Sequence, residues 1–239
     1  MLRRVIRPVG TAPSGHKVVL AHADETLRRF WDQNIQPHID RIDSVAEAAL
    51  FAKKQIAPDD PHNEALRQLR ADARWRWSGA NISTQLAMIL GTSSRQDPMR
   101  YALCVVLPEG LVPVGMLLLA ERFFWPEQDP LVFVWYLSTA PDEALINFGV
   151  KQLRGTGSIL IDHAVCRSFF LGFDGRVLLH AAERGGDSLV AWYQGLGFRR
   201  VPKEQEISTF RTPFNDGRYM HLDSESAAAL IEKYDSRRT

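Results

Sequence analysis

Two glycines separated by one residue stand in segment 152–158, QLRGTGS. Because glycine lacks a Cβ atom, such a segment can turn successive backbone N–H groups into one concavity. At the start of a helix these N–H groups and the helix dipole favour an anion such as a phosphate. A dinucleotide fingerprint would need a third glycine where Leu160 stands, and a Walker loop would need a Gly-Lys-Ser/Thr run, which is absent. The segment therefore predicts a phosphate-binding turn that is neither a dinucleotide fingerprint nor a Walker loop. A plain glycine-rich connection is the alternative.

A second segment, 191–198, has the sequence AWYQGLGF. The apolar side chains in and before it follow the helical spacing i, i+3, i+4 and i+7: Leu189, Trp192, Tyr193 and Leu196. Gly197 is placed to end this helix before Phe198 opens a strand. The spacing puts Tyr193 on the buried face, and a plain helix with a glycine cap is the alternative interpretation of this segment.

Together the two segments resemble the GNAT superfamily of acyl-CoA-dependent N-acetyltransferases, whose signatures are Gln/Arg-x-x-Gly-x-Gly/Ala and Tyr-x-x-x-Gly-Phe. The matching residues are Gln152, Gly155 and Gly157 for the first signature and Tyr193, Gly197 and Phe198 for the second. The resemblance covers roughly residues 101–201. The helical half before it would correspond to the family's variable helices on the substrate side.

The resemblance implies that acetyl-CoA is the co-substrate and that its pyrophosphate binds the glycine segment. The residues carried over to this cradle are Gln152, Leu153, Arg154, Gly155, Thr156, Gly157 and Ser158. The pantetheine arm would pair with the preceding strand near Tyr136, Leu137 and Ser138, where that strand separates from its neighbour. The amine attacks the thioester directly in this family, so the useful groups are an acid for the thiolate and a base for the ammonium.

Tyr193 matches the family tyrosine that protonates the CoA sulfur. For the base, the expected strand 176–182 contains His180, and histidine ordinarily titrates near neutral pH. Family members that acetylate protein N-termini have a Leu-Glu-Val triplet here, where this chain has Leu179-His180-Ala181. A histidine satisfied in the core is the alternative, and Glu121 and then Glu183 are the next candidates.

Two departures from the family pattern concern the neighbouring loops. Residues 141–152 form a longer connection than usual, which we expect to be a short helix or a lid. Asp187 stands where the family often has Asn, and we expect Asp187 or Ser188 to cap a helix.

The elements that must position these residues follow from apolar periodicity. We expect strands at 17–22, 101–107, 112–120, 131–138, 176–182 and 198–201, and helices within 25–55, about 60–73, 155–170 and 189–196. Pro37 and Ser44 should interrupt the first helical region, Asn63 should cap the second, and Pro108-Glu109-Gly110 should close a hairpin. The order indicates a mixed sheet with helices packed on it. With the resemblance, this implies an α/β (α+β) fold of GNAT type: a mixed, mostly antiparallel central sheet flanked by helices, here with an enlarged N-terminal helical region.

We expect one domain over residues 1–239. Its first strand and substrate-side helices would lie in 17–98, the acetyl-CoA-binding core in 99–201, and a final strand and helix in 202–239.

Composition excludes several classes of protein. The 239 residues carry 29 Lys and Arg against 28 Asp and Glu, a net charge of +1, so a dedicated nucleic-acid binder is not favoured. Positive potential for CoA phosphates must then be local, from helix-end amides and neighbours such as Arg154. Cys104 and Cys166 are expected to be buried free thiols, and the seven histidines lack metal-ligand spacing, so no metal is predicted. With no signal-peptide stretch and no apolar run long enough to cross a membrane, a cytoplasmic location is expected.

On the substrate side, Trp75-Arg76-Trp77 could stack on a nucleotide or a cationic amine, but core packing is the preferred interpretation. The arginines nearby are expected on a solvated face: Arg67, Arg70, Arg74 and Arg76. Three functions stay open: an N-acetyltransferase acting on a small-molecule or protein amine, a CoA-binding sensor with the same fold, or an unrelated α/β binding module. The acceptor and the oligomeric state are left undetermined.

Overall fold

A computed structural model describes residues 7–11, 16–54, 69–77, 98–125, 129–150, 153–205, 207 and 215–235. Gln152, Arg67, Asn63 and most of the helix expected from about residue 60 lie outside these ranges. No helix in the described part of the chain combines the length and apolar character needed to cross a bilayer.

The described strands form one sheet in the order β1-β2-β3-β4-β5-β6-β8-β7. They are β1 (Arg7–Thr11), β2 (Lys17–His22), β3 (Met99–Leu107), β4 (Gly110–Phe123), β5 (Leu131–Thr139), β6 (Val177–His180), β7 (Arg199–Arg200) and β8 (Tyr219–Leu222). Every neighbouring pair is antiparallel except β5 and β6, which are parallel. The fold class predicted from the sequence, a mixed and mostly antiparallel sheet flanked by helices, is confirmed.

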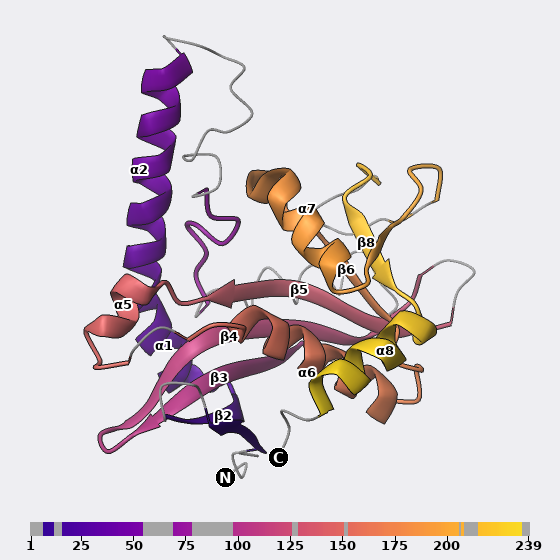
Figure 1. Cartoon of the computed structure of the whole chain (residues 1–239), viewed down its shortest axis with the longest axis horizontal. Helices are drawn as coiled ribbons and strands as arrows, with labels where there is room; N and C mark the ends of the chain where they lie inside the picture. Colours follow the sequence, from indigo (N-terminus) through magenta and orange to yellow (C-terminus); the bar gives the residue numbers. More distant parts are fainter. Residues whose placement is uncertain are drawn as a thin grey trace.

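Helices cover both faces of this sheet (Figure 1). They are α1 (Glu25–Asn34), α2 (Gln36–Lys54), α5 (Asp142–Ile146), α6 (Thr156–Phe170), α7 (Gly186–Gly195) and α8 (Ser224–Asp235), with the short 3-10 helix η1 (Glu183–Gly185) before α7. α6 packs on β4 and β5, and α8 packs against α6. In Figure 1, α2 and α7 rise on the same side of β5, with segment 69–77, drawn in purple, between them.

The central strands are buried along most of their length because helices lie on both sides of them. β4 is buried from Val112 to Glu121. The turn between β3 and β4 falls at Pro108 and Glu109, as predicted for the hairpin. Because these strands are packed on both faces, they hold the side chains at their ends in fixed positions.

β5 leaves β6 partway along its length. Only residues 132–134 of β5 pair with residues 177–179 of β6. On the other side, Val134 pairs with Leu119 and Tyr136 with Leu118, so Trp135 is an extra residue on β5. An extra residue of this kind bends its strand and increases the local twist. The bulge therefore begins where the β6 pairing ends, and the rest of β5 diverges from β6.

Two expectations about helix boundaries are wrong. The break in the first helical region falls at Ile35, between α1 and α2, and neither Pro37 nor Ser44 interrupts α2. Pro37 lies in the first turn of α2, where a missing N–H removes no helical hydrogen bond. Ser44 donates its hydroxyl hydrogen to the Asp40 carbonyl within the same helix (2.8 Å) and leaves the backbone intact.

Residues 69–73, the described end of the second expected helix, are not helical, and a turn lies at 71–74. Arg74 has a φ of 64°, in the left-handed region. Leu69 and Ala73 are apolar residues four positions apart, a spacing typical of a helix, but it does not correspond to a helix there. The connection before α6 does contain the expected short helix, α5.

Candidate active site

The gap between β5 and β6 opens into a cavity of about 480 Å³. Its lining comes from segment 69–77, from β5 between Phe133 and Thr139, from the first turn of α6, from the end of β6, and from η1 and α7. Most of the residues selected from the sequence contribute to this lining, although they are far apart in the chain. Among the described residues, no group of three or more His, Cys, Asp or Glu side chains could hold a metal ion.

The glycine segment forms the first turn of α6. Gly155 adopts the left-handed conformation at the helix N-cap, with φ 85°, and the first helical bond runs from the Ile159 N–H to the Gly155 carbonyl (3.0 Å). Among the described residues, no backbone carbonyl one turn earlier accepts from the N–H groups of residues 156–158. Leu153, Gly155, Thr156, Gly157 and Ser158 all line the cavity. Arg154 is exposed and is not part of the lining.

Close packing holds this turn in place, and two glycines make it possible. A Cβ atom on Gly157 would lie 3.2 Å from the Trp192 ring and 3.7 Å from Cγ2 of Thr139. A Cβ atom on Gly115 of β4 would lie only 2.7 Å from Cγ2 of Thr156. The start of α6 is thus held against β4, β5 and α7.

Of the strand residues predicted for the pantetheine arm, Leu137 belongs to the described lining of the cavity, whereas Tyr136 and Ser138 do not. Leu137 lines the cavity, together with Thr139, which the sequence reasoning did not select. Ser138 is buried and donates its hydroxyl hydrogen to the Asp72 carboxylate. This hydrogen bond links β5 to segment 69–77.

Tyr193 lies in the cavity wall with only 6% of its surface exposed, as its helical spacing predicted. Burial raises the pKa of this phenol far above its ordinary value, and the negative charge of Asp72 raises it further. The hydroxyl therefore keeps its proton through the whole neutral range. No hydrogen-bond partner for this hydroxyl is found among the described residues.

His180 also lines the cavity, at the end of β6. Its Nε2 lies 2.9 Å from Oδ2 of Asp216, and its ring packs edge-on against Tyr219 at 4.9 Å. Burial would raise the pKa of Asp216, but hydrogen bonds from His180 and from the Arg218 N–H lower it overall. Asp216 comes from the loop before β8, and nothing in its local sequence marks it as a partner of His180.

The structure does not bring the other two candidate bases to the cavity. Glu121 is buried on β4, where Arg167 donates to both carboxylate oxygens (2.8 and 2.9 Å) and the Tyr101 hydroxyl donates to one (3.0 Å). Glu183 is exposed in η1. Neither side chain belongs to the described lining.

Asp72 is a cavity residue that the sequence reasoning missed. It is 4% exposed and accepts two hydrogen bonds from Arg70, from Nε at 2.9 Å and from Nη2 at 2.8 Å. The Gln36 side chain donates to the Asp72 carbonyl (2.9 Å). The expectation that Arg70 lies on a solvated face is wrong, because the buried carboxylate two residues later draws its guanidinium into the cavity wall.

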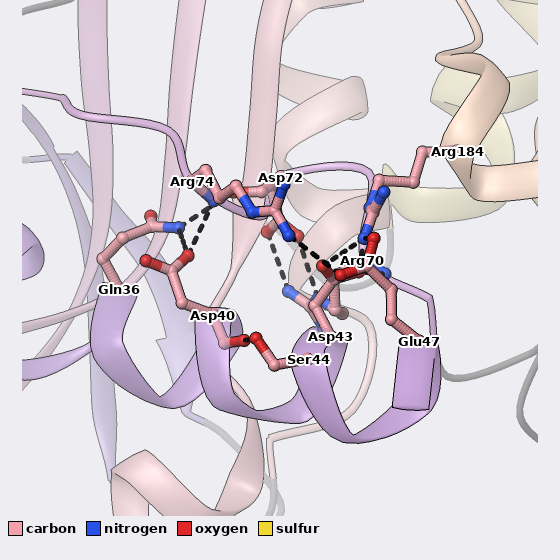
Figure 2. Close-up of polar contacts among 9 residues, drawn as sticks. All are labelled: Gln36, Asp40, Asp43, Ser44, Glu47, Arg70, Asp72, Arg74 and Arg184. Atoms are coloured by element: carbon pink, nitrogen blue, oxygen red, sulfur yellow. Dashed lines mark hydrogen bonds and ion pairs between the residues drawn. The ribbon is translucent and has the colours of Figure 1, made fainter. Parts of the chain in front are cut away.

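A row of acids on α2 extends this network, as Figure 2 shows. Asp43 accepts the backbone N–H of Arg70 (3.0 Å) and Nε of Arg184 (2.9 Å), and Glu47 forms a second ion pair with Arg184. Hydrogen bonds to Asp43 and Glu47 raise the pKa of Arg184 above its usual range. We call these contacts of Arg184 with Asp43 and Glu47 the clasp, since they join α2 to η1 beside the cavity.

The remaining aromatic and polar expectations have mixed outcomes. Trp77 is 1% exposed and packs edge-on against Trp31, so core packing is confirmed for it. Trp75 instead lines the cavity, and the centres of its ring and the Tyr136 ring are 4.5 Å apart.

Asp187 makes no capping bond to α7, whose N-cap is Gly185, so the expectation that Asp187 caps this helix is wrong. Cys104 is a buried free thiol and Cys166 a half-buried one.

No protein-family model matches the chain, and no curated protein matches it. Among solved structures, the chain is similar to a GCN5-related N-acetyltransferase from Brucella melitensis, with 14% identity, 98% of this chain and 87% of that chain covered, and a TM-score of 0.35. It is also similar to a chimera of the spermidine N-acetyltransferase SpeG from Vibrio cholerae, with 16% identity, 76% and 94% coverage, and a TM-score of 0.37. A third is NAA60 of Arabidopsis thaliana in complex with acetyl-CoA, with 15% identity, 74% and 91% coverage, and a TM-score of 0.31. The solved structures that the chain is similar to thus include acetyltransferases, among them a GCN5-related one.

Proposed function

We propose that the chain is a GNAT-type N-acetyltransferase that moves an acetyl group from acetyl-CoA to a primary amine. The observation that supports this most directly is the separation of β5 from β6 next to the first turn of α6. The gap provides unpaired strand edge for an amide-bearing pantetheine arm. The free N–H groups of residues 156–158 provide donors for a diphosphate.

Direct transfer needs few side chains. The amine nitrogen attacks the thioester carbonyl carbon, the carbon–sulfur bond breaks, and its electron pair leaves on the CoA sulfur. Tyr193, which lines the cavity and is protonated at neutral pH, donates its proton to this sulfur. The proton that the new amide nitrogen loses returns the tyrosine to its starting state.

The acceptor enters as an ammonium at neutral pH and must first lose a proton. We assign this step to His180, which lines the cavity and whose Nε2 is held by Asp216. Its other ring nitrogen is then available to take the proton, directly or through water. Asp216 fixes the ring and stabilises the charged imidazolium that results.

A panel of primary amines, small molecules and peptides with free N-termini, tests the proposal by release of free CoA thiol from acetyl-CoA. Thermal stabilisation by CoA is measured on the same protein. Turnover with at least one amine supports the transferase. Stabilisation without turnover would favour the sensor, and no stabilisation by CoA would exclude both.

A further inference from the structure

Arg70 reaches into the gap between β5 and β6, although it comes from a segment before the central strands. The Ala140 N–H donates to the Val114 carbonyl on β4 (2.9 Å), so the carbonyl of the preceding residue, Thr139, points the other way, toward the gap. Nη2 of Arg70 donates to that carbonyl (2.7 Å). The guanidinium thus lies at the last residue of β5, next to the strand edge along which the proposed donor would lie.

The guanidinium is held rigidly but still has hydrogens to offer. Of its five N–H donors, the Nε hydrogen and both Nη2 hydrogens are used by Asp72 and the Thr139 carbonyl. Nη1 has no partner among the described residues. Arg70 lines the cavity and its side chain is 24% exposed, so a ligand in the cavity can contact this side chain.

The start of α6 lies close by. Thr139, whose carbonyl binds Arg70, lies with its Cγ2 3.7 Å from the position that a Cβ atom of Gly157 would take. In the described lining, Arg70 and His180 are the side chains able to carry positive charge. Because the whole chain has a net charge of only +1, attraction for an anionic donor must come from such local groups.

We infer that Arg70 is a further donor-binding residue, whose Nη1 donates to an oxygen of the bound acyl-CoA. This inference rests on the proposed function. The oxygen belongs either to the diphosphate or to a pantetheine carbonyl, both of which accept hydrogen bonds from a guanidinium. Asp72 and Ser138 then act as positioning residues, since they fix the guanidinium against β5.

The test is titration calorimetry of CoA, ADP and pantetheine with the full chain and three variants. Arg70→Lys keeps a positive charge that can pair with Asp72, but lysine has no nitrogen equivalent to Nη1. The double variant Arg70→Gln/Asp72→Asn removes both charges, so no buried carboxylate is left unpaired. Arg74→Gln is the matched control, because Arg74 lies on the same segment, is 67% exposed and is not in the described lining.

Both Arg70 variants should raise the Kd of CoA about 10- to 100-fold, the usual effect of losing a charge-assisted hydrogen bond. The control should stay within about twofold of the parent protein. Weaker ADP binding would assign the contact to the diphosphate, and weaker pantetheine binding would assign it to a carbonyl. If the parent binds CoA and both Arg70 variants bind it equally well, this inference is wrong while the proposed function stands; a parent that binds no CoA overturns both.

Discussion

Replacing Arg184 by Met should destabilise the protein by breaking the clasp. Asp43 is 1% exposed, and without Arg184 its carboxylate keeps, among the described residues, only the backbone N–H of Arg70. Leaving a buried charge without its partner ordinarily costs about 3–5 kcal/mol. Because the Arg184 side chain is 34% exposed, water can partly replace it, and we expect about 2–3 kcal/mol. At about 2–4 °C per kcal/mol for a domain of this size, Tm should fall by about 4–12 °C.

Thermal and urea denaturation of Arg184→Met, Asp43→Asn and the double variant measure this cost. The double variant should lose less than the sum of the single ones, since it leaves no unpaired charge. Arg41→Gln is the matched control: its ion pair with Glu143 is exposed on both sides, 62% and 57%, so its loss should cost less than about 1 kcal/mol. If Arg184→Met is as stable as the control, the clasp contributes nothing and the reasoning is refuted.

Four further outcomes are expected. Tyr193→Phe should lower kcat about 100-fold with little change in the KM for acetyl-CoA, and full turnover would exclude Tyr193 as the acid. His180→Ala should lose the acidic limb of the pH–rate profile, and an unchanged limb would exclude His180 as the base. Gly115→Val should raise the Kd of CoA about tenfold by displacing the start of α6, while Gly195→Ala, with open space around it, should not. The Ser226 N–H lowers the pKa of Asp223, so this carboxylate contributes stability above about pH 4 that is lost on acidification; Asp223→Asn should flatten the acid loss seen in urea titrations.

Local patterns predicted the central part of the fold. The apolar run of β5 and the turn at Pro108 and Glu109 depend on residues next to one another, so short-range spacing was sufficient to predict them. The burial of Tyr193 followed from helical spacing alone. Such features need no knowledge of what lies across the molecule.

Long-range pairings could not be predicted in this way. The bulge at Trp135 depends on register with β4, and the His180–Asp216 contact joins residues 36 positions apart. Arg70 looked solvated because charged residues surround it in the sequence, yet its partners are a buried acid and a strand carbonyl. Only the folded arrangement shows that segment 69–77 forms a wall of the cavity.

Hydrogen exchange with and without CoA tests most directly whether the gap beside α6 holds the acyl donor. On binding, peptides covering residues 135–139 and 153–160 should exchange more slowly, because the donor would bind or shield amides at the edge of β5 and at the start of α6. Peptides from α8, which contributes nothing to the described lining, should be unchanged. Protection at β5 and the start of α6 supports the account, whereas CoA binding that leaves both segments unprotected would contradict it.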